Sequence, residues 1–333
     1  MTNFGPYHDK FEKSLAEYLE VPYVSLVSNA TLGLSLALQA LEVKGKVITT
    51  PYTFVATAHA IVLSGNQPVF VDIDPLTCNL DACSVEKHIS DDVVAIMPVH
   101  VYGNACDTRI YAEISDKYNI PVLYDAAHAF GIKYNGMPLV AYGEYSVLSF
   151  HATKVFNTVE GGAVVSRTRE GKNRIDLLRN FGIINETEVR AVGTNSKMNE
   201  LLAAYGIMQL KNYNSVAKKR ARVSKWYDEM LSSCRNIEYQ TWVSDNRNYS
   251  YYPIFVENEV RERIYEDLKN MGVFSRRYFY PVVTEYEAYA DYREITATLK
   301  AERLSRRVLC LPISDRMKYK DVNAIAKVIR RII

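Results

Sequence analysis

The chain has 333 residues, 48% of them hydrophobic and 23% charged, as in ordinary globular proteins. Its 40 basic and 38 acidic side chains leave a formal charge of only +2, and no basic stripe is interleaved with aromatic residues, so we expect no nucleic-acid partner. No apolar run reaches the about 20 residues of a membrane span, and no charged leader with an apolar segment opens the sequence, so we expect a cytoplasmic protein without a membrane partner.

The first half of the sequence alternates short β-rich runs with helical stretches. The runs are apolar on both faces, which is typical of parallel strands covered by helices on each side. They lie at 24–28, 46–50, 68–73, 93–102, 121–126, 145–150 and 161–166. We therefore predict an α/β fold with one large, mostly parallel, seven-stranded sheet. The run at 30–42 is apolar nearly all round and predicts a buried helix, whereas 107–119 is amphipathic and predicts a covering one.

The character of the sequence changes after residue 195. Residues 198–231 contain a single glycine and no proline, and predict one long helix or a broken pair. Strand-like runs at 249–256 and 308–313 follow, with a helix near 259–271 between them and a helix at the end. We predict a large domain over 1–210, and a linking helix with a small α+β domain over 211–333.

Three motifs carry the chemistry. SNATLGL, residues 28–34, follows a strand and opens a helix, whose free amides form an anion site, although for this stretch taken alone ordinary helix capping is the preferred explanation. Asp125 ends a buried strand, where ligands gather in open α/β sheets, and a buried carboxylate needs a partner. Nearby His128 is a capping, packing or site residue.

Lys154 lies in a short loop between the last two predicted strands. Alone, it is indistinguishable from a solvated surface lysine. A partly desolvated amine, however, has a lowered pKa and can form a Schiff base. A phosphate site, a carboxylate for a pyridinium proton and an amine for an aldehyde are together what pyridoxal 5'-phosphate (PLP) requires. The five cysteines show no metal-ligand spacing, so we expect no metal.

The ordered motifs SNATLGLSLAL, PYTFVATAHAI, YDAAHAFG, SFHATKVFNTVEGGAVVS and GTNSKMNELLAAYG resemble the DegT/DnrJ/EryC1/StrS family of nucleotide-sugar aminotransferases, and the resemblance covers nearly the whole chain. It implies a type I PLP-dependent transferase fold and a homodimer with active sites at the subunit boundary. It also implies a place in deoxyamino sugar biosynthesis, such as that of O-antigen and lipopolysaccharide.

The resemblance also implies roles for individual residues. Lys154 would form the Schiff base, Asp125 would pair with the pyridine nitrogen, and Phe54 would stack on the ring. His128 would lie near the cofactor's 3-hydroxyl, and Asn195 would reach the partner subunit's cofactor phosphate. The same phosphate group would be held within each subunit by Ala30, Thr31 and Ser149.

The segment around Lys154 resembles the form associated with amination at C4 of a 4-keto-6-deoxy sugar, with His151 and Glu160 on the substrate side. A turn that caps a strand start explains these two residues equally well. We expect an amino-acid donor, most simply L-glutamate, and dTDP-4-keto-6-deoxyglucose as acceptor. C3 amination or a UDP-sugar acceptor is the alternative within the family.

Other functions also fit parts of the sequence. A nicotinamide dehydrogenase lacks support because no G-x-G-x-x-G follows an early strand. A non-catalytic PLP-binding regulator on the same fold stays open, since fold does not fix function. So does an inactive shortened form, because family members usually begin with about two dozen further residues. The family also often has arginine where Lys197 stands, which keeps the charge but removes the fork geometry.

Overall fold

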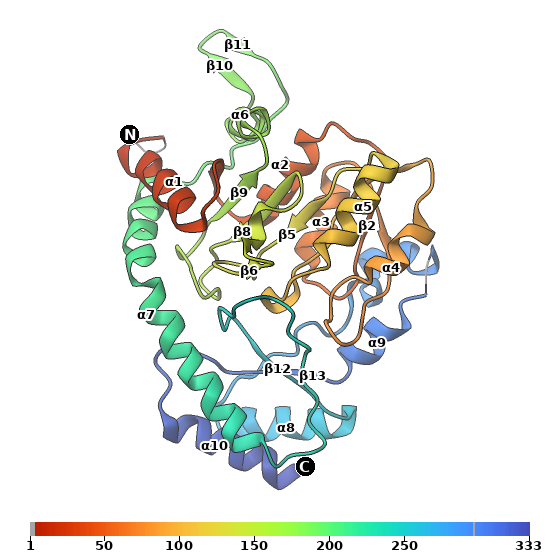
Figure 1. Cartoon of the computed structure of the whole chain (residues 1–333), viewed down its shortest axis with the longest axis vertical. Helices are drawn as coiled ribbons and strands as arrows, with labels where there is room; N and C mark the ends of the chain where they lie inside the picture. The colour runs from red at the N-terminus through yellow and green to blue at the C-terminus, as the bar shows by residue number, and fades with distance from the viewer. Residues whose placement is uncertain (1–3, 296) are drawn as a thin grey trace.

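The structure of the chain, a computed structural model, describes residues 4–295 and 297–333. Within these residues, seven strands form the main sheet in the order β1-β9-β8-β5, then β4-β2-β3 (Figure 1). Parallel bridges between Ile96 and Val122 and between Val99 and Asp125 join the two groups. Because β9 alone runs against its neighbours, the prediction of a mostly parallel, seven-stranded sheet is confirmed. The strands are β1 (Val24–Val27), β2 (Lys46–Thr49), β3 (Gln67–Phe70), β4 (Val93–Ile96), β5 (Leu123–Asp125), β8 (Tyr145–Ser149) and β9 (Gly162–Ser166).

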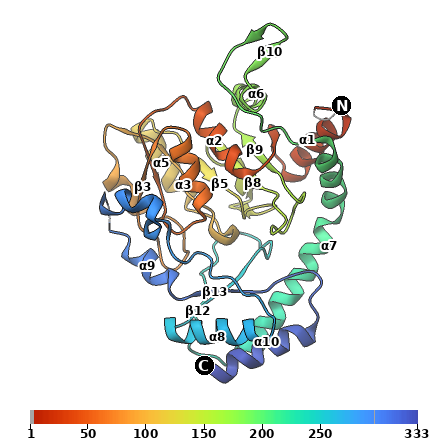
Figure 2. The same ribbon diagram turned by 180° about the vertical axis from the view of Figure 1, so that it is seen from behind.

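Helices cover both faces of this sheet (Figures 1 and 2). Side chains alternate along each strand, so Leu148 of β8 packs in one apolar cluster with Phe11, and Val147 packs in a second cluster with Leu34. The strand sequences are therefore apolar on both faces, as the parallel arrangement requires. The covering helices are α1 (Pro6–Leu19), α2 (Ala30–Ala40), α3 (Val55–Leu63), α4 (Ala82–Val85), α5 (Thr108–Tyr118) and α6 (Arg169–Leu178).

The run at 93–102 was predicted to be one strand, but only its first four residues, those of β4, form one. Its end is a 3-10 turn, Val101–Gly103, in which Tyr102 adopts a left-handed backbone with a φ of 59°. This conformation directs the Tyr102 amide at the Nδ1 atom of His128, 3.1 Å away. The polar contact at the sheet edge therefore outweighs the strand propensity of the apolar run.

Helix α7 (Glu200–Leu231) is continuous, which settles the choice between one helix and a broken pair. Its lower half packs on α10 (Tyr319–Ile332), beside α8 (Asn258–Asn270) and the antiparallel pair β12 (Tyr252–Phe255) and β13 (Val308–Leu311) (Figure 1). This group has its own apolar core and forms the predicted small α+β unit, with α9 (Leu299–Ser305) packing back towards the large sheet. The predicted boundary at 210/211 falls inside α7, so the division into 1–210 and 211–333 stays a prediction.

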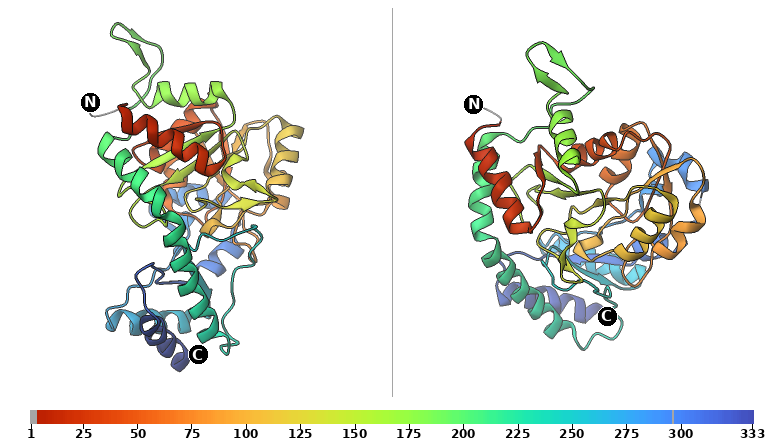
Figure 3. Two further views of the ribbon diagram at one scale, coloured as in Figure 1. Left: turned by 60° about the vertical axis from the view of Figure 1, so that its left-hand side comes forward. Right: turned by 45° about the horizontal axis from the view of Figure 1, so that its top comes forward.

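A hairpin of β10 (Ile183–Asn185) and β11 (Glu188–Val189) stands clear of the body beyond α6 (Figure 3). It differs from the small hairpin of β6 (Lys133–Tyr134) and β7 (Met137–Pro138), which lies against the body of the molecule. Its apolar side chains are exposed, with Val189 at 68% and the adjoining Val192 at 86% of their full accessibility. In the part of the chain that the structure describes, no helix has the length and apolarity to cross a membrane.

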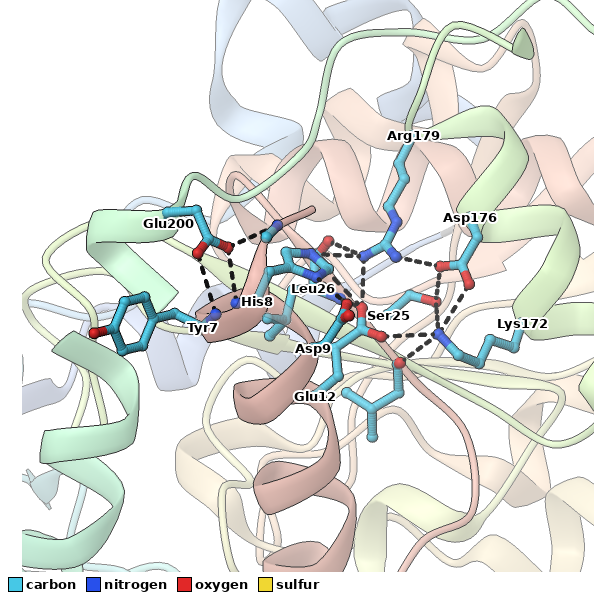
Figure 4. A network of polar contacts seen from close by, with 12 residues as sticks. Tyr7, His8, Asp9, Glu12, Ser25, Leu26, Lys172, Asp176, Arg179 and Glu200 are labelled. Atoms are coloured by element: carbon cyan, nitrogen blue, oxygen red, sulfur yellow. Dashed lines mark hydrogen bonds and ion pairs between the residues drawn. The ribbon is translucent and has the colours of Figure 1, made fainter. Parts of the chain in front are cut away.

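A network of charges around the buried Arg179 fixes α1 to the body of the molecule (Figure 4). The Arg179 guanidinium donates to Glu12 Oε1 at 2.7 Å and to the Leu26 carbonyl at 2.6 Å, and pairs with Asp176 at 2.6 Å. Lys172 approaches the other oxygen of Glu12 at 3.2 Å. Burial favours the neutral form of Glu12, but the two cations outweigh it and leave the pKa of this carboxyl below its ordinary value.

Replacing Arg179 with methionine is expected to lower the free energy of unfolding by about 3 kcal/mol, because it leaves Glu12 buried with one cation instead of two. Chemical denaturation monitored by circular dichroism measures the change. The matched control is Arg109→Met, which removes the exposed pair with Glu113 and should change stability by less than about 0.5 kcal/mol. Equal effects of the two substitutions would contradict the assigned role of the network.

Candidate active site

The candidate site lies where several parallel strands end at one edge of the sheet. Both β1 and β8 run antiparallel to β9, and β8 runs parallel to β5, so the carboxyl ends of β1, β5 and β8 point the same way. Asp125 is the last residue of β5, Ser149 is the last of β8, and Asn29 joins β1 to α2. These ends and the loop after β8 surround a cavity of about 590 Å³.

The start of α2 forms one wall of the cavity. Asn29 caps the helix by accepting a hydrogen bond from the Leu32 amide at 2.9 Å, while the amides of Ala30 and Thr31 belong to the first turn, which has no intrahelical acceptors. Gly162 lies against this turn so closely that a Cβ there would come within 3.0 Å of the Ala30 nitrogen. The amides and the helix dipole therefore provide a compact anion cradle beside Ser149.

Asp125 presents a buried carboxylate to the same cavity, with 5% of its surface exposed. Its Oδ2 atom accepts a hydrogen bond from the Thr57 hydroxyl at 2.7 Å, and its Oδ1 atom accepts one from the Ala127 amide at 3.1 Å. Burial raises the pKa of Asp125, whereas the two hydrogen bonds and the charge of Lys154 oppose that rise. The contacts therefore favour the ionised carboxylate in a place where water cannot stabilise it.

Thr57→Val is expected to raise the pKa of Asp125 further, because it removes the hydroxyl that stabilises the carboxylate. Since this folded-state pKa already lies above the unfolded value, ionisation of Asp125 costs stability as pH rises through the folded pKa. The destabilisation caused by Thr57→Val, about 2 kcal/mol where Asp125 is ionised, should therefore shrink as the pH falls and the carboxyl becomes protonated. Urea unfolding of the apoenzyme measures it, and Thr57→Ser should restore most of the loss. A pH-independent effect would contradict this role.

Lys154 approaches the cavity from the loop between β8 and β9, where its backbone amide closes a turn onto the His151 carbonyl at 2.9 Å. Its Nζ atom lies 3.2 Å from the Tyr251 hydroxyl. Burial lowers the pKa of Lys154 to about 8, although Asp125 and Tyr278 partly oppose the change. About a tenth of this amine is thus unprotonated at pH 7, in the form that a nucleophile requires.

His151 and Glu160 form the outer rim of the cavity. Their side chains are about half exposed, at 48% and 56%, and the His151 Nε2 atom lies 3.6 Å from Glu160 Oε1. The His151 Nδ1 atom contacts the Thr153 hydroxyl at 2.9 Å. This geometry keeps the pair open to a ligand that enters the cavity from solvent.

Comparison with known proteins shows to which family the chain belongs. Residues 1–330 match the DegT/DnrJ/EryC1/StrS aminotransferase family. The chain belongs to this family. The predicted membership is thereby confirmed, and with it the expectation of an aminotransferase.

Named members of the DegT/DnrJ/EryC1/StrS family resemble the chain along most of its length. A dTDP-4-amino-4,6-dideoxy-D-glucose transaminase of Shigella dysenteriae is 46% identical over 99% of this chain and 91% of its own length. A protein of the same name from Escherichia coli is 40% identical over 97% of this chain and 88% of its own length. Similarity at this level extends over the large sheet and the small α+β unit alike.

Solved structures of the family have the same fold. The structure of DesI in the presence of its TDP-sugar product superposes with a TM-score of 0.93 at 33% identity, covering 99% of this chain and 85% of DesI. The structure of NtdA from Bacillus subtilis, with bound cofactor PMP, superposes with a TM-score of 0.91 at 26% identity, covering 99% of this chain and 78% of NtdA. These similarities confirm the predicted fold class.

The structure brings together nearly all the residues that the sequence and the family resemblance singled out. Lys154 and Asp125 line one cavity together with Ala30, Thr31, Phe54, His128, Ser149, His151 and Glu160. Asn195 lies elsewhere, exposed between β11 and α7, where it pairs with Asn180. Its assignment to a partner subunit's cofactor stays a prediction, as do the individual roles of the cavity residues.

Two residues of the site, Thr57 and Tyr251, escaped the sequence analysis. Thr57 lies one turn after Phe54 at the start of α3, so its bond to Asp125 could have been suspected from the helix phase. Tyr251 reaches the cavity from the C-terminal part of the chain, and no local pattern indicates its contact with it. Tyr278 also lines the cavity. It belongs to the segment RRYFYP, whose resemblance to the family's aromatic segment makes ligand contact one of two alternatives, beside packing.

Proposed function

We propose that the protein transfers an amino group from L-glutamate, through PLP, to C4 of dTDP-4-keto-6-deoxyglucose. The main support is the grouping of an anion cradle, a buried carboxylate and a desolvated lysine in one cavity of about 590 Å³. The names of the two relatives at 46% and 40% identity support the sugar, because amination of this keto sugar at C4 gives dTDP-4-amino-4,6-dideoxyglucose.

PLP, when bound, supplies a ring that takes up the electrons of a bond broken at the substrate carbon. The residues present fit such a group. Lys154 would bind its aldehyde covalently, Asp125 would hold a proton on its ring nitrogen, and Phe54 would pack on its ring face. His128 would lie near its 3-hydroxyl. Its phosphate would be held by Ala30 and Thr31 at the start of α2 and by Ser149.

The position of Lys154 in the cavity suits it to transfer a proton in each of the two half-reactions. In the ligand-free cavity the Lys154 amine has a pKa of about 8, so when it is not bound to the cofactor it would be available as a base. It can take a proton from the substrate carbon in one half-reaction and return one to the sugar carbon in the other. Arginine could not act in this way because its side chain does not deprotonate.

The half-exposed pair of His151 and Glu160 would contact the sugar at the rim. A second cavity of about 330 Å³ adjoins the first through Phe54, Tyr278 and Phe279, and Arg276 lies in its wall. We assign this space to the nucleotide end of the substrate, because an arginine beside aromatic rings suits phosphate and base.

Two copies of the chain would form the working enzyme. The exposed apolar side chains of the β10–β11 hairpin and of α7, among them Val189, Val192, Leu201 and Met208, suit burial against a second copy. Asn195 lies between these two elements and would then face the partner subunit's cavity. Sizing in solution tests the dimer, and a fully active monomer would contradict the proposed role of Asn195.

An acceptor panel tests the proposed reaction. The enzyme is converted with L-glutamate to its amino form and then offered 4-keto and 3-keto sugars, each linked to dTDP or to UDP. We expect the fastest single turnover with dTDP-4-keto-6-deoxyglucose, measured by mass spectrometry of the amino sugar. Turnover with the 3-keto sugar alone would overturn the C4 assignment, and a preparation that ignores added PLP would overturn the proposal as a whole.

A further inference from the structure

Tyr251 forms a direct link between two residues of the candidate site. Its hydroxyl oxygen lies 3.2 Å from the Lys154 Nζ atom and 3.3 Å from the His128 Nε2 atom. The ring of Tyr251 also lies under the lysine, with Nζ 5.7 Å from its centroid. The three groups therefore form a short chain of hydrogen bonds inside the cavity.

The segment 248–250, which precedes Tyr251, is hydrogen-bonded both to the segment after β5 and to α7. Asn248 donates to the carbonyls of His128 at 2.7 Å and Phe130 at 3.1 Å, which fixes the segment to the large sheet. From α7, the buried Arg220 donates to the carbonyls of Tyr249 at 2.8 Å and Ser250 at 2.9 Å. The position of the tyrosine thus depends on contacts to both parts of the fold.

The hydrogen bond from Tyr102 determines which nitrogen of His128 carries the proton. The Tyr102 amide can only donate, so the Nδ1 atom that it approaches at 3.1 Å must accept. Burial lowers the pKa of His128 and keeps the ring neutral, which leaves the proton on Nε2. The Nε2 proton then points to the Tyr251 oxygen, and the hydroxyl proton of Tyr251 is free to point to Lys154.

We propose that Tyr251 is a further positioning residue of this aminotransferase, whose hydroxyl, oriented by His128, donates a hydrogen bond to the free amine of Lys154. The inference rests on the proposed function, in which this amine is released and must act as a base. A neutral amine accepts the tyrosine proton and completes the chain. An ammonium group has no lone pair to accept that proton, so only the neutral amine can complete the chain. The Tyr251 hydroxyl therefore favours the neutral, reactive form, whereas its ring, which Tyr251→Phe retains, does not.

Several other charged and titratable groups surround the hydrogen-bonded chain of His128, Tyr251 and Lys154. Asp125 and Tyr278 act on Lys154 and favour its charged form. Those that act on Tyr251 are Cys310, Arg220 and Arg276. The rim adds His151 and Glu160. A substitution that removes only the Tyr251 hydroxyl leaves all of these in place, so its effect on the lysine can be measured separately.

The test measures the reactivity of Lys154 in the apoenzyme. The protein is acetylated with acetic anhydride at a series of pH values, and mass spectrometry quantifies the Lys154 peptide against that of the exposed Lys225. Tyr251→Phe should raise the pKa of the Lys154 amine by about one unit. The matched control is Tyr249→Phe, which removes a hydroxyl outside this chain of hydrogen bonds and should leave the Lys154 titration unchanged.

A second pair of variants keeps the inference testable if Tyr251→Phe folds poorly. His128→Leu removes the donor that orients Tyr251 and should raise the lysine pKa in the same direction. His128→Gln retains an N–H donor and should restore a titration close to that of the unaltered protein. An unchanged or lowered lysine pKa in Tyr251→Phe would overturn the inference.

The outcome is separable from that of the proposed function. Acetylation of the apoenzyme involves neither PLP nor a keto sugar, so the lysine titration stands whatever the acceptor panel shows. Within the holoenzyme, Tyr251→Phe should lower kcat about tenfold with little change in KM, and should move the acid limb of the kcat profile to higher pH. A change in KM alone would indicate substrate binding instead and would overturn the positioning role.

Discussion

Lys154→Ala is expected to abolish amino transfer, with a loss of roughly 10⁴-fold or more in turnover, because in the proposed function one amine would both bind the cofactor and move the proton. The variant should also lack the visible absorption band that covalently bound PLP would give to the enzyme. Single-turnover assays with L-glutamate and absorption spectra measure the two effects. The fold should survive, since burial of a lysine amine does not stabilise the protein.

Lys154→Arg is the matched control for charge. It retains a cation in the cavity but offers no amine that can deprotonate, so it should be as inactive as the alanine variant. A variant of either kind that keeps more than a tenth of the original turnover would remove Lys154 from the proposed chemistry. Lys225→Ala, at an exposed position of α7, should leave turnover unchanged.

Asp125→Asn is expected to lower turnover by about 10²- to 10³-fold, because the amide has nearly the same shape but no charge to stabilise a proton on the cofactor ring. Binding of PLP should weaken less, since the cradle at the start of α2 is untouched. The same substitution removes a carboxylate whose pKa is raised by burial, so the apoenzyme should become more stable at pH 8. Kinetic assays and urea unfolding measure the two effects.

The control for Asp125→Asn is Asp91→Asn, which alters an exposed carboxylate in the loop before β4. It should change neither turnover nor stability measurably. Loss of stability at pH 8 in Asp125→Asn would show that the carboxylate holds the local structure together, and its proposed role towards the cofactor would then need another basis.

The strand pattern could predict much of the fold and of the site because the relevant signals are local. Apolar runs on both faces imply a parallel sheet, and parallel strands end at one edge, which is why Asp125 and Ser149 meet there. The loop with Lys154 follows the same edge. Each of these residues could be placed from the strand that carries it.

Other contacts could not be predicted because they join distant parts of the chain. Tyr251 lies 97 positions after Lys154, and nothing in the sequence around it indicates that the preceding residues fold back onto His128 and Phe130. The prediction that a strand extends to the end of the run at 93–102 was wrong for a related reason. Its apolar residues favour a strand, but the backbone turns at Tyr102, whose amide donates a hydrogen bond to the imidazole of His128, 26 positions away.

The docking of α1 on α7 has a consequence for synthesis of the chain. Glu200 accepts hydrogen bonds from the amides of Gly5, Tyr7 and His8, and the Phe11 ring lies against Gly206. These partners lie some 195 positions apart, so at about 5 to 20 residues per second the first helix emerges from the ribosome about 10 to 40 s before its partner. Throughout that interval the apolar face of α1 lacks its final cover, and nascent chains are open there to chaperones.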